Sequence, residues 1–510
     1  MKNYLLLIKI GVERILVGNS KKHKKTVKNG LVGFGLIAIL AIGISVAYAI
    51  SLGSAFNEVG AIYSLPMMMF FSLVLLVFLY GTFDGFTNLF SYKDYPLLSS
   101  MPIKKTTLVL SKLTTTYLIN VAITVLILMP ANIVYAYYVP QKAGFYLSAV
   151  VLCLILPLIL VPISILFALI IKLLVSRFKN SKQIETVLMI VFYTALTVAF
   201  LFLSYGEDSV NLYAKIPISK WYFNALTSIE YLLYFTFTGV VLSGIITTII
   251  TIFYHNLYSV LTAVKTSGKY KLKKSKVTSP FFALVKKEFR KTVSIVTYAM
   301  NSYIGAVMFL IIAIGAPIAL NEYGLLDIIS PYAVPFVLII VCFTVNMNTP
   351  TSASLSLEGQ AFGLLKTLPV STEKILMAKL VAGTIVSLVS ALLGTTILVI
   401  VLEFSFIDAL LTLIGAITMT IGLSALGLFF NSIKINLDWS NVTEPVKQSL
   451  PVILTVLVTF AITLLLGVIG YYGFDHARLA LLVQTLIACV LCALGLYLVL
   501  TVSVKKFNEK

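Results

Sequence analysis

The chain has 510 residues, of which 59% are hydrophobic and 11% charged, and its mean hydropathy is +1.02. A soluble protein of this size could not bury that much apolar surface and still present a polar exterior. A formal net charge of +19 is typical of proteins that bind nucleic acid, but the basic runs of this chain adjoin apolar runs, where anionic lipid head groups would meet them. We therefore expect a membrane protein that contacts membrane lipids and has no nucleic-acid partner.

Apolar runs of about 20 residues, long enough to span a bilayer as helices, follow one another along the chain. The first half has runs at about 30–52, 62–82, up to 138, 146–174, 184–204 and 233–262. The second half has runs at about 299–320, 332–350, 378–402, 406–430, 450–471 and 478–504. An amphipathic, charged stretch precedes each set, at 3–18 and 281–293, and should lie along the membrane interface.

The basic residues fall almost entirely on one side of this topology. Of the 38 lysines and arginines, only Lys142, Lys215, Lys220 and Arg478 are expected on the other side. Basic residues favour the cytoplasmic side of a membrane. The sequence therefore predicts a multi-pass protein of the cell membrane with both termini in the cytoplasm.

One polar, proline-containing stretch occurs twice. Leu97–Leu113 (LLSSMPIKKTTLVLSKL) and Leu364–Leu380 (LLKTLPVSTEKILMAKL) align without a gap. The alignment matches Pro102 with Pro369 and Lys112 with Lys379, which indicates a tandem duplication.

The predicted organisation follows from this duplication. Residues 1–264 form a first six-helix repeat with its N-terminal interfacial helix, 265–280 a basic cytoplasmic connector, and 281–510 a second six-helix repeat. Because each half starts inside and has an even number of spans, the repeats are parallel rather than inverted. The predicted fold is thus an all-α polytopic membrane protein of about 12 transmembrane helices in two parallel six-helix repeats.

Catalytic, metal-binding and cofactor-binding constellations are not evident. His23, His255 and His476 are scattered at different membrane edges, and no GxxxxGK[ST] motif for a nucleotide phosphate occurs. The four cysteines lie inside apolar runs and are typical of packing residues. We therefore expect no enzymatic activity and no cofactor, and the sequence identifies no substrate-binding residue.

The repeated stretch is typical of a contact site for a cytoplasmic partner. A proline followed by polar residues predicts a helix that starts just below the membrane. Leu97, Leu98, Leu364 and Leu365 would then form an exposed apolar knob that can insert into a groove of a cytoplasmic partner. A connector that merely re-enters the membrane is the alternative.

These residues resemble the cytoplasmic segment of ABC type-2 transporter permeases, whose pattern is an acidic residue, LLxxLPΦ, a helix and a lysine. Glu358–Ser371 matches in full, and Asp94–Ile103 matches with Met101 in place of Leu368. Asn436–Ser449 is similar to a segment of large Gram-positive permeases of this group. The resemblance implies a coupling helix at each motif, contacted by a cytoplasmic ABC ATPase dimer that hydrolyses the ATP.

The residues that the resemblance assigns to ATPase coupling are Asp94, Leu97, Leu98, Pro102, Lys112, Glu358, Leu364, Leu365, Pro369 and Lys379. Many members of the family have six spans and dimerise. One chain with both halves can therefore supply the whole pathway, although pairing with a second permease chain stays open.

The predicted function is the permease subunit of an ATP-driven exporter. The alternative is an ion-coupled secondary transporter of hydrophobic or amphipathic substrates. The near absence of ionisable residues from the span centres weighs against that alternative. A membrane-embedded enzyme acting on lipids or glycans would need clustered carboxylates or histidines, which the sequence lacks.

Overall fold

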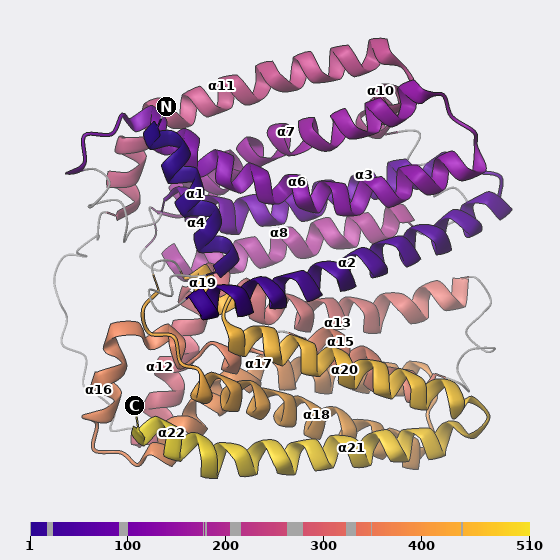
Figure 1. Cartoon of the computed structure of the whole chain (residues 1–510). Coiled ribbons are helices and arrows are strands. Elements are labelled where there is room, and N and C mark those ends of the chain that lie inside the picture. The colour runs from indigo at the N-terminus through magenta and orange to yellow at the C-terminus, as the bar shows by residue number, and fades with distance from the viewer. Residues whose placement is uncertain are drawn as a thin grey trace. The chain divides into compact units, whose positions relative to one another are not determined.

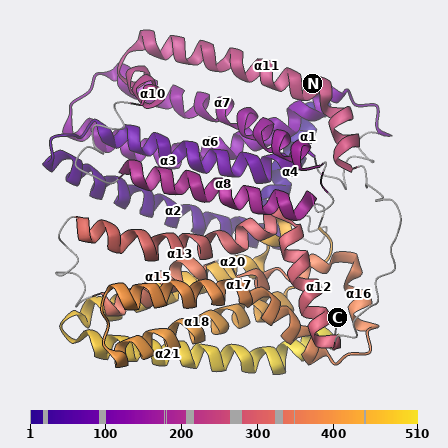
Figure 2. The ribbon, with the colours of Figure 1, turned by 180° about the vertical axis from the view of Figure 1, so that it is seen from behind.

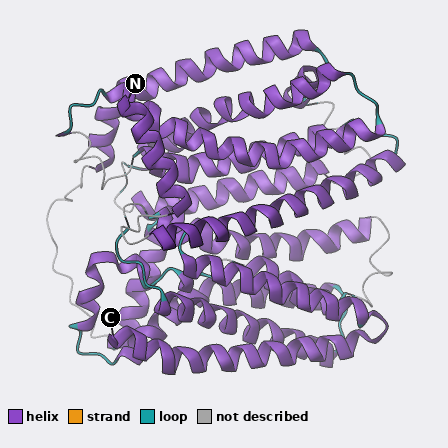
Figure 3. Ribbon diagram, in the orientation of Figure 1, coloured by secondary structure: helices purple, strands orange, loops and turns teal. Residues whose placement is uncertain are grey.

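The computed structural model describes residues 2–17, 24–90, 100–176, 178, 181–204, 216–262, 279–322, 333–347, 349–439 and 442–509. These residues form helices and loops, and none of them lies in a strand (Figure 3). The chain divides into two compact units. The first unit is Met1–Ser181 with Ala195–Gly268, and the second is Lys182–Thr194 with Lys269–Lys510.

The helices of the first unit cover five of the six expected spans of the first half. They are α1 (Lys2–Val17), α2 (Lys24–Glu58), α3 (Ser64–Tyr80), the π-helical turn η1 (Gly81–Gly85), α4 (Phe86–Leu89), α6 (Lys105–Tyr138), α7 (Ala143–Val175), α10 (Pro217–Thr227) and α11 (Ile229–Thr262). Helix α8 (Ser181–Ser204) is divided between the units at Thr194. Helix α6 packs against α1, α2, α3 and α7, and α7 packs against α11 (Figure 1).

A further helix lies between the expected spans at 184–204 and 233–262. Of the residues between these spans, 205–215 lie outside the described part of the chain, and Pro217–Thr227 forms α10. Tyr222 is fully buried and stacks on Phe70 with ring centroids 4.5 Å apart. Tyr222 is therefore a core residue of the first unit.

The second unit repeats a similar order of helices. It contains α12 (Pro280–Ser294), α13 (Val296–Glu322), α15 (Val334–Val345), α16 (Phe362–Lys366), α17 (Thr372–Val401), α18 (Phe406–Ile433), α19 (Thr443–Lys447), α20 (Leu450–Tyr472), α21 (Ala477–Leu498) and α22 (Val504–Glu509). Short 3₁₀ turns η3 (Pro350–Ser352), η4 (Ser356–Ala361) and η5 (Phe474–His476) and the π-helical turn η6 (Val499–Ser503) link them. Helix α17 packs against α12, α13 and α18, and α15 packs against α20.

Helices α18 and α21 of the second unit approach each other closely at small residues. A Cβ atom at Gly422 of α18 would lie 2.7 Å from the backbone nitrogen of Cys492 in α21. A Cβ atom at Gly495 of α21 would lie 2.8 Å from the carbonyl oxygen of Gly422. Small residues let membrane helices approach this closely.

Long apolar helices identify the membrane-spanning part. Within the described residues, nine helices are long and apolar enough to cross a membrane, and Ser64–Tyr80 and Gln183–Ala199 are shorter apolar helices. Many of their large apolar side chains are exposed, including Leu464, Val468, Leu486 and Val490 on α20 and α21. Such a surface suits lipid rather than water, and helices satisfy all of their own backbone groups in that setting.

The second expected span of the second half is interrupted. Helix α15 ends at Val345, and the chain continues through η3 and η4 until α16 begins at Phe362. The residues of η3 are buried, as are Ser356, Leu357 and Gly359 of η4. In both views of the second unit, α12, α16 and α22 gather at one end of the helix bundle (Figures 1 and 2).

Candidate functional site

The second copy of the repeated stretch sits on a cluster of buried charges. Lys379 lies in the second turn of α17, and its side chain is 1% exposed. Its Nζ atom lies 2.5 Å from Oε1 of Glu358 and 2.9 Å from Oε2 of Glu288. The Nζ atom also donates to the carbonyl oxygen of Ser354 at 3.3 Å.

Two lysines of α12 complete this cluster. Lys291 Nζ lies 2.9 Å from Glu358 Oε1, and Lys287 Nζ lies 3.4 Å from Glu288 and 3.6 Å from Glu358. Burial lowers the pKa of the Lys291 ammonium, and the charge of Lys379 lowers it further, against the pull of the two carboxylates. We call Lys287, Glu288, Lys291, Glu358 and Lys379 the buried charge cluster; it joins α12, η4 and α17.

The turn that carries Glu358 is fixed by polar contacts on its other side. Asn431 Oδ1, which is fully buried, accepts from the backbone N–H groups of Leu355 and Ser356 at 2.8 and 3.2 Å. Trp439 Nε1 donates to the carbonyl oxygen of Ser356 at 2.8 Å. In a regular helix, these N–H and carbonyl groups would form hydrogen bonds with other backbone groups. In this buried turn, they form hydrogen bonds with side chains instead.

Gly359 allows the chain to turn at this point. Its φ angle is +54° and its ψ angle is −131°, a conformation that is rare for residues with a Cβ atom. A Cβ atom there would lie 3.4 Å from the ring of Trp439. The glycine therefore lets the backbone turn beside the indole and places Glu358 against Lys379.

Beyond this turn, only part of the expected apolar knob is exposed. Leu364 is 68% exposed and Leu368 39% exposed, and Pro369 is also exposed. Leu365 is 3% exposed and packs in the core beside Phe362, so the prediction that both leucines form the knob is wrong for Leu365. The reason is that α16 is helical, and adjacent residues of a helix face different directions. We call Leu364–Pro369 the tip.

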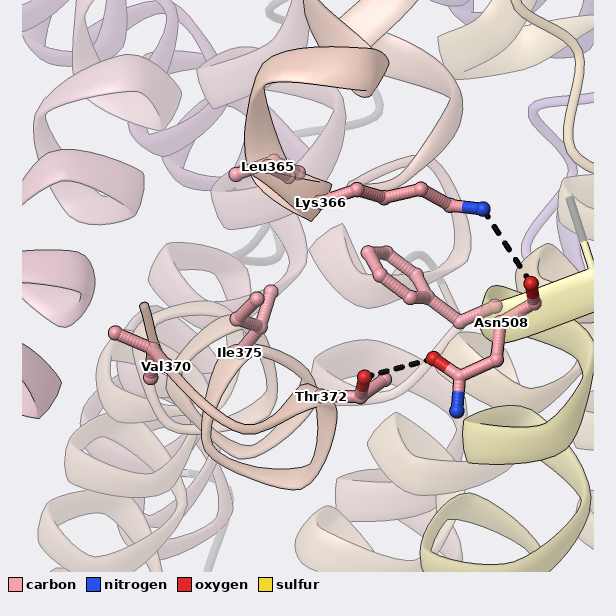
Figure 4. A pocket seen from close by; sticks show the side chains of 7 residues that line it. Leu365, Lys366, Val370, Thr372, Ile375 and Asn508 are labelled. Atoms are coloured by element: carbon pink, nitrogen blue, oxygen red, sulfur yellow. Dashed lines mark hydrogen bonds between the residues drawn. The ribbon is translucent and has the colours of Figure 1, made fainter. Parts of the chain in front are cut away.

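The C-terminal helix α22 packs against the base of the tip (Figure 4). Phe507 is 1% exposed, and its ring lies 5.0 Å from that of Phe362. Thr372 Oγ1 donates to Asn508 Oδ1 at 2.8 Å, and Lys366 Nζ lies 3.5 Å from the carbonyl oxygen of Asn508. The last residues of the chain thus help to hold the tip.

A small hollow lies between the base of the tip and α22. Its volume is about 160 Å³. The apolar part of its lining is Leu365, Val370, Ile375 and Phe507, and the polar part is Lys366, Thr372 and Asn508 (Figure 4). The hollow has room for roughly five water molecules, or for one side chain of moderate size.

The first copy of the stretch is described only in part. Asp94, Leu97 and Leu98 lie outside the described residues. Pro102 is exposed, and α6 begins three residues later at Lys105. These coupling residues stay predictions.

Lys112 occupies the place in α6 that Lys379 occupies in α17. Its Nζ atom donates to the carbonyl oxygen of Leu89 at 3.2 Å, as Lys379 donates to that of Ser354. Asn88 bridges the same elements through Thr116 Oγ1 at 3.2 Å. Both matched lysines therefore tie the start of a long helix to the segment that precedes the motif.

The structure also assigns places to residues that the sequence reasoning did not single out. Glu288, Asn431, Phe507 and Asn508 all support the tip. A signal existed for Glu288, because Leu284, Glu288 and Thr292 recur every four residues and form the buried face of α12. The contacts of Asn431 and Asn508 depend on chain segments more than 70 residues away, which no local pattern reveals.

A comparison with models of protein families identifies the family of the chain. A model described as "Membrane protein of 12 TMs" matches residues 30–502. Because the match covers most of the chain, the protein belongs to this family of membrane proteins. No curated protein and no solved structure matches the chain. The family and the described apolar helices together establish an all-α, multi-pass membrane protein.

Proposed function

We propose that the protein is the membrane-spanning permease of an ATP-driven ABC exporter. A separate cytoplasmic ATPase dimer would hydrolyse the ATP and push on the two copies of the repeated stretch. Rocking of the two halves would then open a pathway alternately to each side of the membrane. The observation that carries the proposal is that the tip is exposed and apolar and stands on the buried charge cluster.

The tip has the features of a docking element. Leu364 exposes two thirds of its surface at the end of a helical turn, where no described neighbour covers it. The buried charge cluster and the Asn431 and Trp439 contacts hold its base, so a force on the tip would reach α12 and α17. Exposed apolar anchors on rigid supports are typical centres of protein interfaces.

The distribution of charge supports a cytoplasmic position for the tip. The basic residues near the tip's end of the second unit are Lys286, Lys287, Arg290, Lys291, Lys366, Lys374, Lys379, Lys434, Lys447, Lys505 and Lys506. Arg478, at the start of α21, is paired with Asp408 at 2.9 Å and belongs to the other end. A basic excess of this kind marks the cytoplasmic side.

The two halves support a duplicated coupling element. In each, the long helix begins three residues after the matched proline, at Lys105 after Pro102 and at Thr372 after Pro369. In each, the interfacial helix packs on that long helix, α1 on α6 and α12 on α17. Two such elements would suit the two subunits of an ATPase dimer.

The proposal is tested by the affinity between the purified full-length protein in lipid nanodiscs and the ATP-hydrolysing subunit that co-purifies with it. Replacing an interface anchor such as Leu364 with serine should weaken binding by about 2 kcal/mol, or roughly 30-fold. Tyr472→Ser removes another exposed side chain, at the far end of α20, and should leave the affinity unchanged. Equal binding of wild type and L364S would contradict the proposal.

A further inference from the structure

The hollow beside the tip is the strongest unassigned feature of the described residues. We propose that it receives an acidic side chain of the cytoplasmic ATPase, so that α22 and the tip together form one docking surface. This inference rests on the proposed function and adds the C-terminal helix and a specific guest to it.

The position of the hollow beside the exposed tip indicates that a partner protein can reach it. Its lining begins at Leu365, directly after the exposed Leu364, and ends at Asn508, which is exposed. A protein that covers Leu364 would therefore also cover the mouth of the hollow. Interfaces commonly combine such an apolar anchor with a neighbouring pocket for one partner side chain.

The lining favours an anionic guest. Lys366 carries its ammonium group at the polar side of the hollow, 3.5 Å from the carbonyl oxygen of Asn508 (Figure 4). The described residues that line the hollow include no carboxylate. The polar part of the lining is therefore positive, while the apolar part can hold the methylene groups of an aspartate or glutamate.

Most of the charged residues around the hollow are basic. Lys374 is exposed in the first turn of α17, and Lys505 is exposed on α22. Glu509, the acidic residue of α22, is paired with Lys506 at 2.7 Å. Glu373 is the acidic exception in this region. The excess of positive charge would attract an acidic partner surface and would make association sensitive to salt.

Helix α22 is held firmly enough to take part in binding. The buried ring of Phe507 and the hydrogen bond from Thr372 fix its end, and Ser432 Oγ donates to Ser503 Oγ at 2.8 Å at its base. The preceding turn η6 is π-helical, an irregularity that is frequent at functional sites. The hollow is thus a built feature between two fixed elements.

The experiment uses the full-length protein in nanodiscs and the co-purified ATPase subunit, identified by its own nucleotide-binding motif. Val370→Trp fills the hollow without removing Leu364, and Lys366→Glu reverses the charge at its polar side. Lys434→Glu reverses an exposed charge at the same end of the unit and serves as the control. We expect about tenfold weaker binding for V370W and K366E, a change of about 1.4 kcal/mol, and no change for K434E.

A photoreactive residue at position 370 separates the possible occupants. Cross-linking to an ATPase peptide that contains an aspartate or glutamate supports the inference, provided that thermal unfolding of the variant matches wild type. Cross-linking to anionic lipid alone, with K366E weakening only vesicle binding, overturns it. If L364S weakens ATPase binding but V370W and K366E do not, the inference fails and the proposed function stands. If none of the three variants changes binding, both fail.

Discussion

At the scale of single residues, Lys379 is the link between the repeated stretch and the rest of the second unit. Its ammonium group is buried between Glu288 of α12 and Glu358 of η4. A buried ion pair adds little net stability over an apolar contact, but the loss of one partner leaves an uncompensated buried charge. The pairing therefore makes the position of the tip depend on three elements at once.

Lys379→Met should lower the free energy of unfolding by about 3–5 kcal/mol, because Glu288 and Glu358 would lose their most buried partner. Thermal unfolding of the purified protein in detergent measures this effect. Lys374→Met, five residues earlier on an exposed position of the same helix, should change the free energy by less than about 0.5 kcal/mol.

The double variant Lys379→Met with Glu288→Gln provides a check on the cause. Removing one of the stranded carboxylates should recover part of the loss, because residues in one ion-pair network are coupled. If the double variant loses more free energy of unfolding than the two single variants lose together, the buried charges are not the cause of the loss in Lys379→Met.

Two glycines in the same segment give opposite predictions. Gly359→Ala places a Cβ atom at φ +54° and 3.4 Å from the ring of Trp439, and should cost about 1–3 kcal/mol of stability. Gly363→Ala lies in α16 with nothing within 4 Å of the new atom, and should be neutral or stabilising by up to about 1 kcal/mol. Thermal unfolding of the two variants, measured in parallel, tests these predictions. Equal destabilisation would contradict the claim that the backbone at position 359 requires a glycine.

Sequence reasoning reached some of these residues but not their contacts. The gapless repeat singled out Lys379, and the resemblance added Glu358 and gave both a coupling role. Both side chains are nevertheless buried and touch one another. Nothing in the local sequence fixes a pairing between residues 21 positions apart across a broken helix. Leu365 was misplaced for a similar reason, since the exact turn of α16 decides which leucine faces the core.

At the scale of elements, the spans were predictable and the irregular segments were not. Each of the twelve expected spans contains a helix, because an apolar run of about 20 residues is a property of composition, but α15 covers only Val334–Val345 of the run expected at 332–350. The turns η3 and η4 and the helix α10 were missed, because their form depends on tertiary contacts such as that of Tyr222 with Phe70.

Helix α22 is an element whose place depends on one aromatic side chain. Phe507→Ala removes a buried ring, a loss worth about 3–5 kcal/mol in a protein core, and should release α22 from the tip. Limited proteolysis should then cut the C-terminus much faster than in wild type. Lys505→Ala, on an exposed position of the same helix, should leave the rate of cleavage unchanged. Equal protection of both variants would show that Phe507 does not hold α22.

At the scale of the whole molecule, the chain is a multi-pass helical protein of the family of 12-TM membrane proteins. Its described residues contain no group of histidine, cysteine, aspartate and glutamate that could hold a metal ion. The buried charge cluster and the exposed tip lie together at one end of the second unit, where the basic residues gather. The proposed ATPase would act on this tip from outside the chain.

The rate of ATP hydrolysis by the co-purified ATPase subunit, measured with and without the protein in proteoliposomes, tests the central claim most directly. The account predicts that the wild-type protein changes this rate several-fold, that L364S abolishes the change, and that Y472S retains it. The account is contradicted if no ATP-hydrolysing subunit co-purifies with the wild-type protein, or if L364S changes the rate as much as wild type does.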